Sequence, residues 1–146
     1  MMKRLLLSLL LALLLSSTVQ AVDTVGVATE VLAKTGISWD GSPLPAYPDR
    51  SPEITILRIT ILAGTSLPLH RHPVINAAVL LSGELTVITD GDKTLYLKAG
   101  DPIVEVVDKW HYGKSTGKDP AIILVFYAGA IDMPITIMNC GFSQNP

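Results

Sequence analysis

The sequence predicts an all-β protein with a single domain, and three observations support that fold class. Short runs rich in Val, Ile, Leu and Thr are separated by Gly, Pro and Asp, and several runs alternate apolar and polar residues. After the N-terminal apolar run, no segment of useful length has the spacing of an amphipathic helix. The 146 residues contain no internal repeat and have the length of one domain. Several strands at this spacing predict a barrel or a sandwich.

Residues 1–21 have the pattern of a secretory signal peptide. Two basic residues precede an apolar run from Leu5 to Leu15, and small residues ending at Ala21 offer a cleavage site. The apolar run is about half of the roughly 20 residues that a membrane-spanning helix needs. We therefore expect cleavage after Ala21, a mature chain from Val22 with no membrane anchor, and a periplasmic or secreted location.

The charge balance excludes several classes of partner. The sequence has 11 basic and 13 acidic residues, and loss of the two basic residues of the leader leaves a net charge near −4 with no basic cluster. Nucleic acids and anionic membrane surfaces are therefore poor candidates. The lone cysteine, Cys140, cannot form an internal disulfide, although it could cross-link a homodimer.

The segment from residue 22 to 52 is predicted to hold a first strand and a strap. Residues 27–34 alternate in a way that predicts a strand, with a short helix as the alternative. Residues 36–52 contain four prolines and cannot form a regular β ladder. Because Trp39 and Tyr47 lie in this stretch, we expect an ordered strap across the barrel, fixed by those two aromatic side chains.

Residues 53–130 are predicted to form the barrel. The first strand there, 53–62, slips in phase at Leu57-Arg58, which predicts a β-bulge. Asp90-Gly91 is a hairpin signal. The polar segment 108–119 is expected to bridge the last two strands, and residues 131–146 to form a C-terminal segment. The remaining predicted strands are 76–82, 84–89, 94–98, 103–107 and 121–128.

The sequence has three histidines, and two of them form His70-Arg71-His72. Residues two apart on a strand face the same side, roughly 6.5 to 7 Å apart, so both imidazoles can converge on one metal ion. Asn76 shares their parity if the strand continues past Pro73, which would place its amide oxygen beside them. A third imidazole would have to come from His111.

These residues resemble the motifs of the cupin superfamily. Gly64-x5-His70-x-His72-x3-Asn76-x6-Gly83 is similar to the first cupin motif, with Asn76 where the family usually has Glu. Gly100-Asp101 followed by His111 is similar to the second motif. Val106, Asp108 and Ser115 there replace the usual Pro, Gly and Asn. The resemblance covers residues 64–115, about half of the expected mature chain.

The resemblance implies a double-stranded β-helix barrel of two antiparallel sheets with one divalent transition metal inside. It implies that His70, His72 and His111 bind the metal, with Asn76 as a weak fourth ligand. The metal could be Fe, Zn, Mn, Ni or Cu, because ligand type alone does not choose among them. An amide in place of a carboxylate would leave the charge of the ion less neutralised and the site more electrophilic.

Glu105 is the candidate proton acceptor or donor. It shares parity with Ile103 and Val107, so it could face the cavity; in the alternative, Val104 and Val106 face inward and Glu105 faces water. One hypothesis is a metal-dependent oxygenase, isomerase or lyase acting on a small molecule. The others are a non-catalytic barrel that binds a small ligand or metal, and a structural barrel that functions as a homodimer. An ionisable side chain facing the ion would favour the enzyme.

Overall fold

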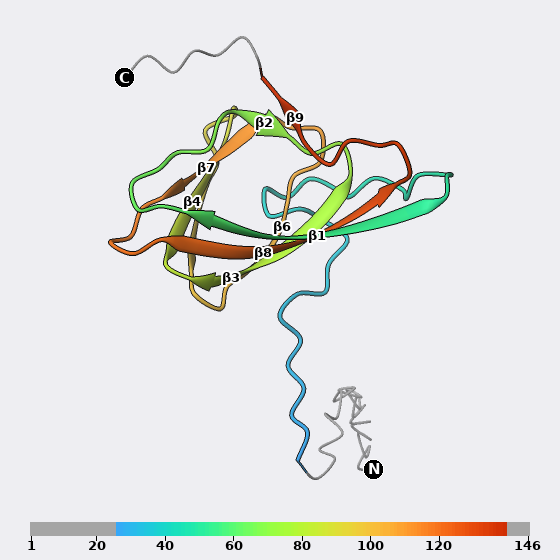
Figure 1. Cartoon of the computed structure of the whole chain (residues 1–146). Coiled ribbons are helices and arrows are strands. Elements are labelled where there is room, and N and C mark those ends of the chain that lie inside the picture. The colour runs from blue at the N-terminus through green and yellow to red at the C-terminus, as the bar shows by residue number, and fades with distance from the viewer. Residues whose placement is uncertain (1–25, 140–146) are drawn as a thin grey trace, which may run out of the picture. The chain divides into compact units, whose positions relative to one another are not determined.

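The computed structural model describes residues 26–139. The chain divides into a first unit that ends at Glu30 and a second unit, Val31–Pro146. The described residues of the first unit, 26–30, are exposed and form neither strand nor helix. The second unit contains all nine strands of the described chain, drawn in Figure 1. The predicted signal peptide and Cys140 lie outside the described residues.

The strands form two sheets. They are β1 (Pro52–Ile61), β2 (His70–Arg71), β3 (Ile75–Ser82), β4 (Glu84–Thr89), β5 (Thr94–Lys98), β6 (Pro102–Val104), β7 (His111–Ser115), β8 (Ala121–Ala130) and β9 (Ile137–Met138). One sheet has the order β1-β8-β3-β6 and the other the order β5-β4-β7-β2-β9. The paired strands are antiparallel throughout. The prediction of an all-β fold with two antiparallel sheets is therefore confirmed.

Strand β1 pairs with β8 without interruption, from Pro52 opposite Ala130 to Ile61 opposite Ala121. The bulge predicted at Leu57-Arg58 is therefore wrong. The apparent slip arose because β1 carries apolar residues on both faces: Ile54 and Ile56 are 52% and 60% exposed on the outer face, whereas Ile61 is buried. The irregularity that does occur lies between Leu80 and Ser82, where β3 pairs with β8.

The alternating pattern of strand β3 determines which of its side chains face the interior. Its buried positions alternate, so Asn76, Ala78 and Leu80 face inward. The core lies between the two sheets, and Gly83, at φ +76°, connects β3 to β4. The buried apolar residues that fill the core come from both sheets; the most buried include Val74, Leu80, Leu85, Val87, Ile103 and Ala121.

The predicted hairpin between β4 and β5 is present. Its turn is closed by hydrogen bonds from Thr89 N to Lys93 O at 3.0 Å and from Asp92 N to Thr89 O at 3.1 Å. The residue with positive φ is Asp92, at 60°, rather than the neighbouring Gly91. Asp tolerates this conformation better than most residues, so the turn forms without glycine at that position.

Three predictions of local structure were wrong. Residues 27–34 form neither strand nor helix. The polar segment 108–119 is not a simple bridge, since it contains β7, and the predicted strand 103–107 is only partly strand, since β6 ends at Val104. In each case the alternation of residues did not reveal which neighbour would supply backbone hydrogen bonds, and pairing decides whether a short run becomes a strand.

The strap at residues 36–52 is ordered, but only one of the two aromatic residues that were expected to fix it packs against the core. Trp39 packs against the core, and its backbone N–H donates to Val104 O at 2.9 Å. Tyr47, in contrast, is 74% exposed. Within residues 26–139 there is no helix long and apolar enough to cross a membrane.

Candidate metal centre

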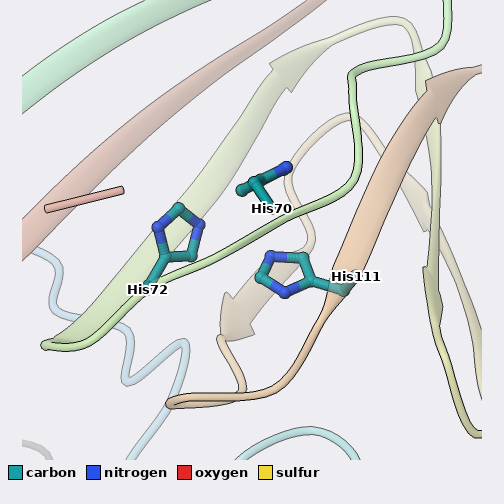
Figure 2. Close-up of side chains that lie close together, drawn as sticks. All are labelled: His70, His72 and His111. Carbon is teal, nitrogen blue, oxygen red and sulfur yellow. The ribbon is translucent and has the colours of Figure 1, made fainter. Parts of the chain in front are cut away.

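The three histidines lie together inside the second unit. Strands β2 and β7 pair so that His70 lies opposite His111, and His72 follows two residues later on the same side. The candidate ligand nitrogens of the three side chains all lie within 4.8 Å of one another. Figure 2 shows the three rings gathered around a common space, two from one segment and one from β7. The prediction that the three imidazoles converge is therefore confirmed.

Main-chain oxygens orient all three rings. The Nδ1 atoms of His70, His72 and His111 lie 2.7, 2.8 and 2.9 Å from the carbonyl oxygens of Pro68, Ile135 and Lys109, respectively. A carbonyl accepts only, so each Nδ1 carries the proton and donates it. Each Nε2 is then left with a free lone pair. Metal-binding histidines are commonly fixed in this way, with the second nitrogen donating to a backbone carbonyl.

Burial keeps these imidazoles neutral. Burial lowers the pKa of His72 to about 3, and it also lowers the pKa values of His70 and His111. Neutral imidazole is the form that binds a metal ion. Three neutral nitrogens at this separation suit a divalent transition metal, so the donor set fits the cofactor that the sequence predicted.

Asn76 lies on the same inner face, as its parity predicted. It is 1% exposed and lines the cavity beside His70 and His72. The one hydrogen bond of its amide is a long one, from Nδ2 to Val74 O at 3.5 Å, and Oδ1 has no partner. A buried acceptor without a partner is unfavourable and marks a place where an ion, water or ligand can bind.

Glu105 faces the cavity, as the inward alternative predicted. It is 9% exposed, and its Oε2 lies 3.9 Å from His111 Nε2. Burial raises the pKa of Glu105 to about 7, with small opposing effects of hydrogen bonds from Val106 N and Trp39. Because burial favours the neutral form of both groups, the contact with His111 is not an ion pair. Val106 is buried as well, since the chain leaves β6 after Val104.

The strap holds Glu105 in place. Trp39 Nε1 donates to Glu105 Oε2 at 3.3 Å, and Ser38 Oγ donates to Glu105 O at 2.8 Å. Asp40 connects the strap to His111 through Lys109. The carboxylate of Asp40 accepts a hydrogen bond from Lys109 Nζ at 2.5 Å, and the carbonyl oxygen of Lys109 accepts the hydrogen bond that orients the ring of His111. Burial alone would raise the pKa of Asp40, but hydrogen bonds from Lys109 and Ser42 lower it to about 2, so this link stays charged.

A cavity of about 210 Å³ opens beside the histidines. Its other walls are apolar, and the polar side chains that line it are those of His70, His72, Asn76, Glu105, Tyr127 and Thr136. Thr136 is also close to the site, since its Oγ1 lies 3.2 Å from His72 Nδ1. Burial raises the pKa of Tyr127 to about 12, which keeps its hydroxyl protonated.

The sequence did not point to the contacts of Trp39 or of the C-terminal segment. Trp39 was expected to pack, but its bond to Glu105 joins residues 66 positions apart. Ile135 and Thr136, which contact His72, lie just before β9, which pairs with β2. The alternating run Ile135-Thr136-Ile137 was a strand signal that could have placed this segment in the sheet.

Comparisons with known proteins agree with this architecture. The sequence profile of a family described as Cupin domain matches residues 57–127. No curated protein sequence matches the chain. Among solved structures, an uncharacterised protein with a double-stranded β-helix domain from Klebsiella pneumoniae is 20% identical, with a TM-score of 0.52. That match covers 66% of this chain and 87% of the other.

Two enzymes are also similar in fold. An oxalate oxidase in complex with the substrate analogue glycolate is 24% identical, with a TM-score of 0.50, over 58% of this chain and 45% of the enzyme. A structure from a study of DMSP lyases is 19% identical, with a TM-score of 0.52, over 59% of this chain and 44% of that one. This chain therefore spans less than half the length of either enzyme chain. At these identities the likeness shows the fold alone.

Proposed function

The chain belongs to the cupin superfamily, and from that premise we propose that it is a mononuclear metalloenzyme acting on a small molecule. His70, His72 and His111 would hold one divalent transition metal, and Asn76 would face that ion with its unpaired amide oxygen. The observation that carries the proposal is the buried carboxyl of Glu105, whose Oε2 lies 3.9 Å from His111 Nε2 in the same cavity. Proton transfer needs such a group within reach of the reacting atoms.

The chain's own residues account for the rest of the chemistry. A bound ion would supply Lewis acidity at the polar end of the cavity. Glu105 would accept or donate a proton at Oε1, because among the described residues both hydrogen bonds to its carboxyl end on Oε2. Trp39 holds that carboxyl in a fixed orientation. The other walls of the cavity are apolar, which lowers the local polarity and strengthens electrostatic interactions there.

The test of the metal site compares two neighbouring substitutions. His70→Ala removes one ligand, whereas Arg71→Ala changes the next residue, which points away and pairs with Asp108. We expect elemental analysis to find about one metal ion per chain in the wild type and in Arg71→Ala and far less in His70→Ala. The ligand variant should also melt at a lower temperature, because bound metal stabilises the folded state. Equal metal content in both variants would rule out the site.

A second experiment separates an enzyme from a binding module. Metal-loaded protein is incubated with a panel of small neutral and singly charged molecules, and products are followed by mass spectrometry. We expect Glu105→Gln to keep its metal and to slow conversion at least about 100-fold, the usual contribution of a general acid or base. Binding without conversion by the wild type would instead support the non-catalytic barrel, which the missing carboxylate at position 76 also favours.

We also propose that the protein is exported. The support is the pattern of residues 1–21, with basic residues, an apolar run and Ala21 at the cleavage site. Mass spectrometry of the protein from its native host should give a mature chain that begins at Val22. A chain that keeps its first residues would contradict export by this route.

Self-association is a further part of the proposal, with a homodimer as the expected assembly. The support is the outer face of the sheet β1-β8-β3-β6, where large apolar side chains are exposed. They are Ile54, Ile56, Leu81, Leu124 and Phe126, which are 41% to 60% exposed. Contiguous apolar patches of this kind mark interaction surfaces.

A further inference from the structure

The cavity beside the histidines is poor in positive charge. Among the described residues neither Lys nor Arg lines it, and its polar side chains gather around His70 and His72. Any charge on a ligand would therefore be balanced only by the ion of the proposed site. A ligand with two separate negative charges would have to bury one of them against apolar walls, and burying an uncompensated charge is strongly unfavourable.

One acceptor atom at the polar end has no donor among the described residues. Asn76 Oδ1 is buried without a hydrogen-bond partner. The reverse orientation of this amide would place its oxygen 3.5 Å from Val74 O, so the oxygen is the end left unpaired. Glu105 accepts two hydrogen bonds on Oε2, so Oε1 carries the proton when this carboxyl is neutral and can donate it to a ligand oxygen. The unpaired oxygen of Asn76 requires a ligand that brings an O–H or N–H group.

The apolar walls of the cavity determine the size and polarity of the rest of the ligand. Leu57, Ile59 and Leu67 line one part of the cavity, and Ala78, Ile123 and Val125 line another. The volume of about 210 Å³ is that of about seven water molecules, at roughly 30 Å³ each in liquid water. The space therefore suits a short hydrocarbon group attached to a compact polar head, and it is too small for a large ring system.

We propose that the ligand is a small hydroxyl-bearing molecule with at most one negative charge and a short hydrocarbon chain. Its head would lie beside the three histidines and donate a hydrogen bond to Asn76 Oδ1, and its chain would occupy the apolar part of the cavity. This inference rests on the proposed function, because the head would also meet the metal ion. It excludes dicarboxylates as preferred ligands.

Three matched probes test the inference by calorimetry on zinc-loaded protein. The parent probe is 2-hydroxyhexanoate, hexanoate lacks the hydroxyl donor, and 2-hydroxyhexanedioate adds a second carboxylate. We expect the parent to bind about tenfold or more tightly than either relative, since an unmade hydrogen bond or a buried second charge costs at least that factor. A dicarboxylate that binds as tightly as the parent would overturn the inference.

Substitutions at position 76 assign the preference for the hydroxyl group. Zinc binds α-hydroxy acids through two oxygens, so part of any preference could come from the ion. Asn76→Leu should reduce the hydroxyl preference several-fold, whereas Asn76→Asp, which keeps an acceptor, should retain it. If Asn76→Leu folds and its preference for the hydroxyl group is unchanged, the role of Asn76 is overturned. If Asn76→Leu does not fold, loss of the hydroxyl preference in Asn76→Asp overturns that role instead.

Failure of the inference and failure of the metal site give different results. Zinc uptake is measured first, in the same calorimeter. Absence of uptake defeats the proposed metal site, and two neutral probes on metal-free protein then decide the inference: hexan-1-ol should bind more tightly than 1-methoxyhexane, which lacks the hydroxyl donor, and equal binding would overturn the inference. Zinc uptake together with the wrong probe order defeats the inference and leaves the metal site standing.

Discussion

Glu105 has an unusual environment for a carboxyl group. It is 9% exposed, and the groups nearest to its oxygens are Trp39, the backbone of Val106 and a neutral imidazole. Because its pKa is raised from 4.5 to about 7, the folded protein without metal binds a proton here more tightly than the unfolded chain does. Its stabilising contribution is therefore complete below about pH 4.5 and is lost as the pH rises through about 7.

Glu105→Gln should remove this pH dependence. Relative to the variant, metal-free wild type should lose on the order of 3 kcal/mol of unfolding free energy between pH 4.5 and 8, at about 1.4 kcal/mol per pKa unit. Urea unfolding at several pH values measures the difference in unfolding free energy between wild type and Glu105→Gln. Because both proteins contain the same histidines, the contribution of histidine titration cancels in this difference. Exposed Glu53→Gln is the control and should follow the wild type. Parallel curves for wild type and Glu105→Gln would show that the carboxyl is not buried.

Position 76 allows a direct test of charge at the metal site. Asn76→Glu adds a carboxylate beside His70 and His72, and Asn76→Gln adds the same length without charge. We expect the Glu variant to bind zinc at least about tenfold more tightly than the Gln variant, because an anionic ligand neutralises the ion. Competition with a chelator measures both affinities. Equal affinities would mean that the side chain at position 76 does not reach the ion.

At the scale of single elements, the glycines of the first motif have different physical roles. Gly64 and Gly83 share a φ of +76°, which is unfavourable for residues with a Cβ. A Cβ on Gly64 would meet nothing within 4 Å, whereas one on Gly83 would lie 2.5 Å from Pro120 O and 2.8 Å from Ala121 Cα. Gly83 is thus required both by the turn and by the close approach of the chain before β8.

This difference predicts unequal costs for the same substitution. Gly64→Ala should cost about 1 to 2 kcal/mol, the usual penalty for the left-handed conformation. Gly83→Ala should cost at least about 2 kcal/mol more, because backbone atoms must move to admit the methyl group. Chemical denaturation of both variants gives the comparison. Similar losses of unfolding free energy in the two variants would mean that the backbone around Pro120 can move at little cost to admit the methyl group.

The sequence predicted the elements whose signals are local. Period-2 alternation identified β3, and Asp90-Gly91 identified the hairpin between β4 and β5. The spacing of His70, His72 and Asn76 placed all three on one inner face. Local patterns failed where pairing with distant segments decides the structure, as in β7 and β9. The alternating run at residues 27–34 showed the opposite error, since alternation without a partner strand makes no sheet.

The candidate site was predictable to the same degree. The cupin motifs indicated which histidines meet, whereas parity allowed an inward Glu105 but did not decide between it and the outward alternative. What orients these groups lies far away in sequence: Trp39 bonds to Glu105, and Ile135 O bonds to His72. Such contacts depend on how the strap and the C-terminal segment fold back, which no local pattern encodes.

At the scale of the whole molecule, the outer face of the sheet β1-β8-β3-β6 should determine assembly. Strands β1 and β8 have ten residues each, β3 has eight and β6 has three. At about 3.3 Å per residue and about 4.8 Å between strands, the face covers on the order of 500 Å², more than half of the roughly 800 Å² per partner in a standard interface. A second copy of the chain offers the same apolar face, so a symmetric pair would cover both.

Phe126→Glu should shift a dimer to monomer, because Phe126 lies in β8 in the middle of this face and is 44% exposed. Light scattering after gel filtration measures the mass. Tyr96→Glu is the control, since Tyr96 is a 76% exposed aromatic residue of β5 in the other sheet, and it should leave the mass unchanged. A wild type that stays monomeric at high concentration would contradict this assembly.

The anchoring of the three imidazoles to Pro68, Ile135 and Lys109 carries an evolutionary consequence. Peptide oxygens stay in place when side chains change, so the orientation of the rings does not depend on the identity of the cavity walls. Residues such as Ile59, Ala78 or Val125 can therefore be exchanged to admit a different molecule while the chelating geometry is inherited intact. A scaffold organised in this way can acquire new specificities one wall residue at a time.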